Sequence, residues 1–210
     1  MSRKLAFRLT GVLLLVGGSV PALAQEFSAD LVRQKPTGAA TTKVFVNGDK
    51  MRLEATGQTK QSYVILNLAK RTSLMALPDS KSYVVSPPGR IPASIPFFHI
   101  DDPDNACPAW EKSTDKPGTC KKLGDDTING RSTVKYAGTA SDGNTVTAWI
   151  DRKLHFVIKW EGQKGAAELQ NIQEGPQAAS LFEIPNDYEK LDVAAARENA
   201  KKNNKPVPHK

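Results

Sequence analysis

The sequence of 210 residues lacks the common signatures of catalysis. It has no H-E-x-x-H metalloprotease motif, no glycine-rich nucleotide-binding pattern and no G-x-S-x-G nucleophile elbow. Its three histidines are not grouped with its two cysteines, so the ligand spacing of a zinc site is missing. We therefore expect no catalytic residues, no metal and no other cofactor.

Clustered carboxylates are present, but they do not have the spacing of a calcium site. Asp101, Asp102 and Asp104 crowd one loop, yet the glycine and the distal glutamate of a calcium-binding loop are missing. A solvated loop explains this cluster better, with Asp104 capping a short helix over Ala106–Lys112.

A strong excess of one charge is also absent. The formal net charge is +7, and it falls to +4 when the three basic residues of the first 24 positions are set aside. The remaining basic residues are scattered and gather only near the C-terminus, without interleaved aromatic residues. Because nucleic-acid-binding surfaces concentrate basic residues, we expect no nucleic-acid partner.

No apolar run is long enough to span a bilayer. Leu9–Val16 follows Arg8 and two earlier basic residues, and the small-x-small sequence Ala22-Leu23-Ala24 comes after it. This pattern predicts an export signal cleaved after Ala24, and hence a periplasmic or secreted chain that does not span the membrane. An uncleaved anchor is the alternative.

The scarcity of cysteine restricts its role. Cys107 and Cys120 are the only cysteines, and an even number in an exported chain favours a disulfide. The loop that this bond closes, of about 14 residues, is expected to stabilise the fold by about 3 kcal/mol. The chain length suits one domain, so we predict a signal at 1–24, a single domain at 25–190, and the end of a C-terminal helix with a disordered basic tail at 191–210.

Short runs of strand-forming residues, separated by tight-turn signals, fill most of the sequence. Asn47-Gly48, Asn129-Gly130 and Asp142-Gly143 supply the positive φ that hairpin turns need. Strands joined by such short links pair antiparallel, so a mainly β fold is predicted. The expected strands are Phe27–Val32, Thr42–Val46, Lys50–Ala55, Ser62–Leu68, Thr72–Leu77, Lys81–Ser86, Ser132–Tyr136, Thr145–Asp151, His155–Glu161 and Ala166–Gln173.

Alternation of apolar residues predicts which side chains share a face of the sheet. Val146, Ala148 and Ile150 are expected on one face, and Trp149 on the other. The strand around YVILNL, at Tyr63–Leu68, is apolar on both faces and therefore needs cover on both sides, as does SLMAL in the next strand.

A proline-rich segment and the C-terminal region are expected to supply this cover. Pro87–Lys122 has seven prolines and no periodic pattern, so it is predicted to be a long loop with apolar side chains. A turn of helix is expected at Ala178–Phe182, closed by Pro185. A longer helix is expected from Asp187 to about Lys201, because Asn186–Glu189 resembles a capping box.

Four sequence motifs resemble those of one protein family. They are KVFVNGDKMR at Lys43–Arg52, KKLGDDTING at Lys121–Gly130, AWID at Ala148–Asp151 and SLFEIPNDY at Ser180–Tyr188. Together they are similar to an uncharacterised branch, a domain of unknown function, of the LolA-like superfamily of lipoprotein-carrier and LppX-like half-barrels. The resemblance implies a half-open β-barrel: a strongly curved antiparallel sheet with the proline-rich segment as a cover and a C-terminal helix.

The resemblance implies binding rather than catalysis, since related families carry lipoproteins, bind lipids or sense misplaced lipoproteins. The first hypothesis is a monomeric carrier or sensor that binds an apolar ligand, such as a lipoprotein acyl chain. The second is an interaction module of the cell envelope without a small ligand, and the third is an envelope hydrolase. A ligand cavity is expected to be lined by Phe45, Tyr63, Ile65, Met75, Trp149 and Val157, with Phe97 and Phe98 from the cover.

Overall fold

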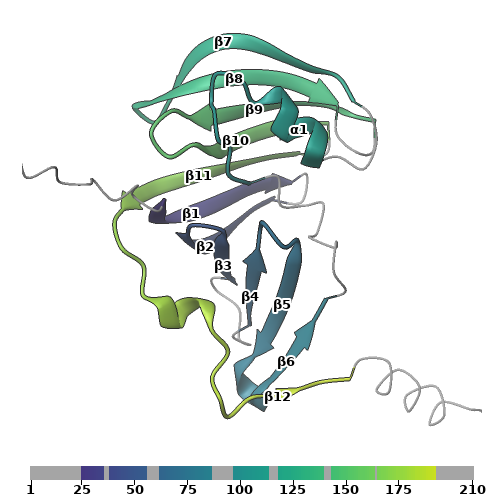
Figure 1. Ribbon diagram of the computed structural model, residues 1–210, viewed down its shortest axis with the longest axis vertical. Helices are drawn as coiled ribbons and strands as arrows, with labels where there is room; N and C mark the ends of the chain where they lie inside the picture. The colour runs from purple at the N-terminus through teal and green to yellow at the C-terminus, as the bar shows by residue number, and fades with distance from the viewer. Residues whose placement is uncertain are drawn as a thin grey trace, which may run out of the picture.

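The computed structural model describes residues 25–35, 38–55, 62–86, 97–113, 118–139, 143–163 and 165–192. These residues form twelve strands of one sheet and few helices, so the fold is mainly β, as predicted (Figure 1). The strands are β1 (Glu26–Lys35), β2 (Gly38–Asn47), β3 (Lys50–Ala55), β4 (Tyr63–Asn67), β5 (Thr72–Leu77), β6 (Ser82–Val85), β7 (Cys120–Ile128), β8 (Arg131–Thr139), β9 (Thr145–Asp151), β10 (Phe156–Gly162), β11 (Gly165–Glu174) and β12 (Glu189–Lys190). The helices are α1 (Cys107–Ser113) and the 3₁₀ turns η1 (Pro78–Ser80) and η2 (Ala179–Phe182).

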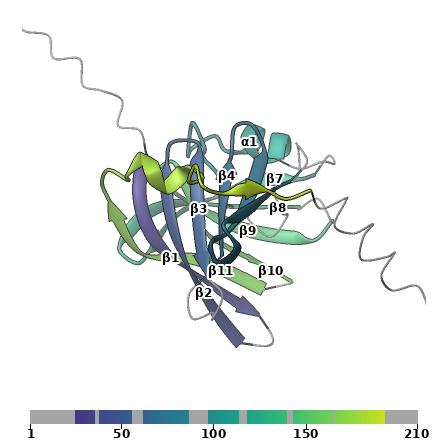
Figure 2. The same ribbon diagram turned by 90° about the horizontal axis from the view of Figure 1, so that it is seen from below.

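Strand β1 joins two hairpin-rich halves into a single sheet. The strand order is β12-β6-β5-β4-β3-β2-β1-β11-β10-β9-β8-β7, so β1 pairs with β2 on one side and with β11 on the other. Neighbouring strands are antiparallel, except that β12 runs parallel to β6. Because β7 and β12 end the order, the curved sheet does not close into a barrel (Figures 1 and 2). The predicted half-open sheet is confirmed.

The ten strands expected from the sequence are all present, with ends that differ by a few residues. The Asn129-Gly130 turn between β7 and β8 has φ of +50° and +77°, as a two-residue hairpin turn of type I′ requires. The sequence predicted no strand over β7. Its residues are mostly exposed and charged and include a glycine, so it lacks the apolar face by which a strand is recognised.

The prediction of a C-terminal helix that begins at Asp187 is wrong for the first residues of that helix. Residues 187–192 contain a turn and strand β12, which pairs with Ser82 and Tyr83 of β6 instead of entering a helix. The remainder of that helix, the basic tail and the predicted export signal lie outside the described residues.

The inner face of the sheet carries one hydrophobic core that both halves share. Buried side chains from β1 to β4 and from β8 to β11 meet in a single cluster, which is possible because the sheet curves around it. Phe27 of β1 and Phe156 of β10 pack edge to face, with ring centroids 5.4 Å apart. Ala148 and Ile150 point into this core and Trp149 lies on the opposite, outer face, so the predicted alternation in β9 is confirmed.

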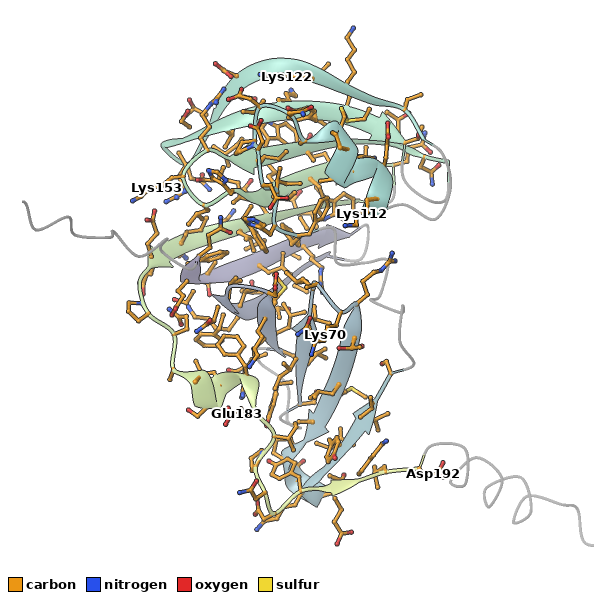
Figure 3. All side chains as sticks on the ribbon, viewed as in Figure 1. Lys70, Lys112, Lys122, Lys153, Glu183 and Asp192 are labelled. Carbon is orange, nitrogen blue, oxygen red and sulfur yellow. A yellow bond between two sulfur atoms is a disulfide. The ribbon has the colours of Figure 1, made fainter. Side chains whose placement is uncertain are left out.

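Residues 97–113, here called the cover, lie over part of this inner face (Figures 1 and 3). The cover begins beside β10, where the Ile100 N–H donates to the His155 carbonyl (2.8 Å) and the Val157 N–H donates to the Phe98 carbonyl (3.2 Å). This edge of β10 is available because β11 pairs only with Lys159–Gly162. The cover is therefore attached to the sheet through backbone hydrogen bonds.

A tyrosine of β8 holds the middle of the cover. The Tyr136 hydroxyl donates to the Pro103 carbonyl (2.9 Å) and accepts a hydrogen bond from the Ala106 N–H (3.3 Å). Tyr136 is fully buried, so water cannot take the place of its hydroxyl as the hydrogen-bond partner of these two backbone groups.

Helix α1 ends the cover and is fixed to β7 and β8. The predicted disulfide between Cys107 and Cys120 is present and joins the first residue of α1 to the first residue of β7. The Trp110 ring packs against Gly138, where a Cβ atom would come within 2.9 Å of the ring. A glycine in β8 thus allows the helix to approach the sheet closely.

Charged side chains link the cover to the strands at the surface. Asp104 accepts hydrogen bonds from Arg152 (2.6 and 3.0 Å) and from Lys122 (2.6 Å), and Arg152 also donates to Asp125 (2.5 Å). The hydrogen bonds from Arg152 and Lys122 hold the pKa of the Asp104 carboxyl well below its ordinary value.

The outer face of β4 and β5 is covered by the C-terminal segment. Tyr63, Ile65 and Ala76 pack against Phe182 of η2, and Leu181, Ile184 and Tyr188 surround this second core. Leu66 of β4 faces the inner core, so β4 is buried on both sides. The expectation that this strand needs two covers is confirmed.

We expect Tyr136→Phe to reduce the free energy of unfolding by about 1–3 kcal/mol, because it leaves two buried backbone groups of the cover unpaired. Urea denaturation measures this change, and amide hydrogen exchange is expected to accelerate in residues 101–113 more than in β1 to β3. Tyr83→Phe, on partly exposed β6, is the matched control and should change stability by less than about 0.5 kcal/mol. Equal effects of the two substitutions would contradict the role of Tyr136.

The lowered pKa of Asp104 predicts a pH-dependent contribution to stability. A carboxyl with a depressed folded-state pKa stabilises the fold fully above its ordinary pKa of about 3.9 and loses this effect as the pH falls toward the folded value. Denaturation midpoints of wild type and Asp104→Asn should therefore differ most near pH 7 and converge as the pH drops below about 4. A difference that stays constant from pH 7 to pH 2 would show that the charge of Asp104 is not the cause.

Candidate functional site

The inner face is not covered evenly. Met75 of β5 lies on this face, opposite Val64 of β4 and Val84 of β6, yet its side chain is 41% exposed. Val64, Val84 and the nearby Leu77 are only partly buried. We call these four residues the open strip. They form an apolar surface on the part of the inner face that belongs to β4, β5 and β6.

The opposite part of the inner face carries two polar side chains without partners. Arg33 of β1 and Trp160 of β10 both pair with Ala167 of β11, so all three side chains share the inner face. The Nε of Arg33 and the indole nitrogen of Trp160 are buried, and neither has a hydrogen-bond partner. Burial lowers the pKa of the Arg33 guanidinium, although an arginine remains charged at neutral pH.

A pocket of about 490 Å³ lies where β10 and β11 separate, next to the β7–β8 turn. It is lined by Ile128, Asn129, Arg131, Ile158, Leu169, Gln170, Asn171 and Ile172. Arg131, the cation of this pocket, forms ion pairs with Asp151 and with Glu174 (2.9 Å). Because the charge of Arg131 is already neutralised by these ion pairs, this pocket is a weaker candidate for binding an anionic group than the region around Arg33.

The residues predicted to bind a ligand do not form one site. Phe97 and Val157 are buried in the inner core, Phe98 packs against it, and Met75 belongs to the open strip. Phe45, Tyr63 and Ile65 lie on the outer face in the second core. Ligand binding by any of these side chains remains a prediction.

On the outer face, Tyr63 helps to fix the C-terminal segment. The Arg52 guanidinium lies 3.6 Å from the centroid of the Tyr63 ring and donates to the Leu181 carbonyl (2.8 Å). Its Nε also donates to Glu54 (2.6 Å). These contacts give Tyr63 a packing role in the structure.

Trp149 lies apart from both cores, on the outer face of β9. The ammonium groups of Lys135 and Lys159 each lie 4.8 Å from its ring centroid, and its indole N–H donates to Asp126 (2.8 Å). This hydrogen bond lowers the pKa of the Asp126 carboxyl. Trp149 therefore lies among charged side chains on the outer face and does not face the inner core.

Two histidines meet near the start of the cover. The rings of His99 and His155 stack with centroids 6.4 Å apart, and the two nitrogens of His99 lie 2.6 Å from Gln25 and 3.2 Å from Asp101. Both nitrogens of His99 therefore have partners, and neither is positioned on a serine hydroxyl. Within the described ranges, no group of three or more His, Cys, Asp or Glu side chains has the arrangement of a metal site. None of the helices in these ranges has the length and apolar character needed to cross a membrane.

Solved structures of other proteins share this fold at low sequence identity. An uncharacterized conserved protein from Thermus thermophilus superposes with a TM-score of 0.52 at 12% identity, over 80% of this chain and 91% of that one. PNGF-II superposes with a TM-score of 0.50 at 14% identity, over 85% of this chain and 34% of its own length, so the chain spans about a third of PNGF-II. MucB of Pseudomonas aeruginosa, solved with MucA, gives a TM-score of 0.46 at 14% identity, over 80% of this chain and 59% of that one.

No protein-family model and no curated protein matches the sequence. The curved sheet, which does not close, has the half-barrel form that the resemblance to the LolA-like superfamily implied, and the Thermus thermophilus protein shares this fold. At these identities the likeness concerns the fold alone.

Sequence reasoning overlooked Arg33 and Trp160. A signal for Arg33 is present, because it continues the alternation of Phe27, Ala29 and Leu31, which places a cation on an apolar face. Trp160 lies in the expected strand His155–Glu161, where an aromatic residue is typical of the core of a sheet. Its missing hydrogen-bond partner cannot be inferred from sequence.

The buried position of Phe97 generates a stability prediction. Its ring is 1% exposed within the inner core, so Phe97→Ala should reduce the free energy of unfolding by about 3–5 kcal/mol. Phe98→Ala, which truncates the partly exposed neighbouring ring, should reduce the free energy of unfolding clearly less than Phe97→Ala does. Urea denaturation of both variants measures the difference. A negligible effect of Phe97→Ala would show that the ring belongs to a removable lid.

Proposed function

We propose that the protein is an exported carrier or sensor that binds an apolar ligand, an acyl chain of a lipid or lipoprotein, on the inner face of its half-barrel. The observation that carries this proposal is the open strip. Its four apolar side chains lie on the concave side of the sheet, beside the part of the inner face that forms the buried core. Soluble proteins rarely expose contiguous apolar surface on a concave face without a partner for it.

Export is supported by two features of the chain. The basic residues, apolar run and Ala22-Leu23-Ala24 sequence have the pattern of a cleaved signal. The disulfide between Cys107 and Cys120 is of the kind that persists in oxidising compartments.

The scale of binding follows from the hydrophobic effect. Each buried CH₂ group contributes about 0.8 kcal/mol, and part of this gain is offset by the ordering of ligand and protein. A chain of about a dozen carbons is therefore expected to bind with roughly micromolar affinity.

An interaction module without a small ligand is the second candidate. Phe97, Ile100 and Trp110 of the cover fill the inner face over β8 to β10, so this part of the half-barrel is occupied by the chain itself. Under this alternative, the open strip contacts a protein instead of an acyl chain.

A fluorescent fatty acid and a charge introduced into the open strip test the proposal. Met75→Glu should weaken binding of the probe about tenfold or more, because the bound chain would have to contact a carboxylate. Val85→Glu is the matched control: Val85 is 43% exposed on the neighbouring strand β6 but lies on the other face, opposite Leu74. This control should bind like wild type, and both variants should keep the wild-type melting temperature.

Native mass spectrometry of protein purified from the periplasm provides a second measurement. The proposal predicts a co-purified lipid and a polypeptide mass that begins at Gln25. If the wild-type protein carries no lipid and binds no apolar probe, the carrier function is refuted and the interaction module takes its place.

A further inference from the structure

Arg33 differs from the other arginines that the structure describes in detail. Arg52, Arg131 and Arg152 each donate to a carboxylate, and Arg52 donates to a carbonyl as well. Arg33 shows no such partner within the described part of the chain, and its Nε is buried without a hydrogen bond. A partly buried cation without a counter-charge is unfavourable, so its presence on an apolar face calls for an explanation.

The sheet itself separates Arg33 from nearby acidic residues. Asp30 of β1 and Glu168 of β11 alternate to the outer face, where they pair with Lys43 (3.1 Å) and Lys159 (3.8 Å). On the inner face, the residues that pair with Arg33 are Ala40 and Ala167. Neither alanine supplies an acid to the guanidinium.

Trp160 adds a second hydrogen-bond donor on the same face of the sheet. It pairs with Ala167 from the other side, so its Cα lies about 10 Å from that of Arg33, two strand spacings away. The small side chain of Ala167 lies between the two large ones. The two side chains therefore lie on either side of Ala167 on the inner face, and the buried Nε of Arg33 and the indole N–H of Trp160 are both donors without an acceptor.

We propose that Arg33 and Trp160 form the recognition site for the anionic head group of an amphiphilic ligand, a carboxylate or a phosphate carried on an alkyl chain. This inference rests on the proposed function and names the chemistry of its ligand. The guanidinium supplies the charge and a planar set of donors, and the indole N–H supplies one further hydrogen bond to a head-group oxygen.

The position of the site suits a single amphiphile. The open strip lies on the same face, and Met75 of β5 is four strands from β1, a distance of about 19 Å along the sheet. Leu53 and Val44 lie between them on the inner face and belong to the buried core, so the region that separates the two sites is apolar. In the proposed complex, the head group lies at Arg33 and the alkyl chain contacts apolar residues of this face.

Binding of dodecanoate, dodecyl phosphate and uncharged dodecanol, measured by calorimetry, tests the site. The wild-type protein should bind at least one of the anions about ten- to a hundredfold more tightly than dodecanol. Arg33→Gln should abolish this preference while dodecanol binding and the melting temperature are maintained. Lys43→Gln, which removes the same charge from the outer face of β2, is the matched control and should keep the preference. The tighter anion shows whether the ligand is a fatty acid or carries a phosphate.

The indole signals of the three tryptophans give an independent readout by nuclear magnetic resonance, assigned with Trp→Phe variants. Dodecanoate, or dodecyl phosphate if that binds more tightly, should shift the Trp160 indole N–H signal. The Trp110 and Trp149 N–H groups already donate to Thr139 (3.1 Å) and Asp126 (2.8 Å), so their signals should move less.

The outcomes separate this inference from the proposed function. Equal affinity for the anions and dodecanol, or an unchanged preference in Arg33→Gln, overturns the head-group site and leaves the carrier function intact. A Trp160 signal that does not respond removes Trp160 from the site. Failure of the wild-type protein to bind any of the three compounds refutes the proposed function, and this inference with it.

Discussion

The packing of Phe97, Ile100 and Trp110 against the inner face of the sheet is the contact on which the rest of the structure depends. A sheet of twelve strands with two ends has no closed barrel to stabilise it, so its curvature must be held by what lies inside. The cover does this through the hydrophobic core, the hydroxyl of Tyr136, backbone bonds to β10 and the disulfide to β7. Because the cover is integrated in this way, the proposed ligand site lies on the part of the inner face that the cover leaves open.

Arg33, Arg52 and Arg152 differ in whether the fold compensates their charge. Arg52 and Arg152 attach segments to the sheet, one by a carbonyl of the C-terminal segment and the other by a carboxylate of the cover. Their charges are compensated within the fold. The partly buried guanidinium of Arg33 has no such compensation among the described residues, and the proposed head group would supply it.

The sequence predicted those features that depend on local chemistry. The Asn129-Gly130 turn, the alternation around Trp149 and the double burial of β4 follow from backbone preference and residue period, and all are present. Alternation divides a strand into two sets of side chains but does not say which set points inward. Tyr63 and Ile65 were therefore expected on the ligand side, although the C-terminal segment buries them on the outer face.

The features that the sequence did not predict depend on contacts between distant segments. Strand β7 has little apolar pattern, and its Leu123 is half exposed. The strand is held in place by its pairing with β8 and by the disulfide, which are contacts with distant segments. The lack of partners at Arg33 and Trp160 appears only when β1, β10 and β11 lie side by side.

The pairing of β1 with β11 also governs the order in which the chain can fold. β1 is the first strand to be synthesised, but the strand that completes its ladder ends at Glu174. One edge of β1 must therefore remain unpaired until nearly the whole domain has emerged, and loop closure over such a distance slows folding. Until then, the unpaired backbone N–H and C=O groups along this edge can pair with another chain, so this edge is the part of the folding chain most exposed to aggregation.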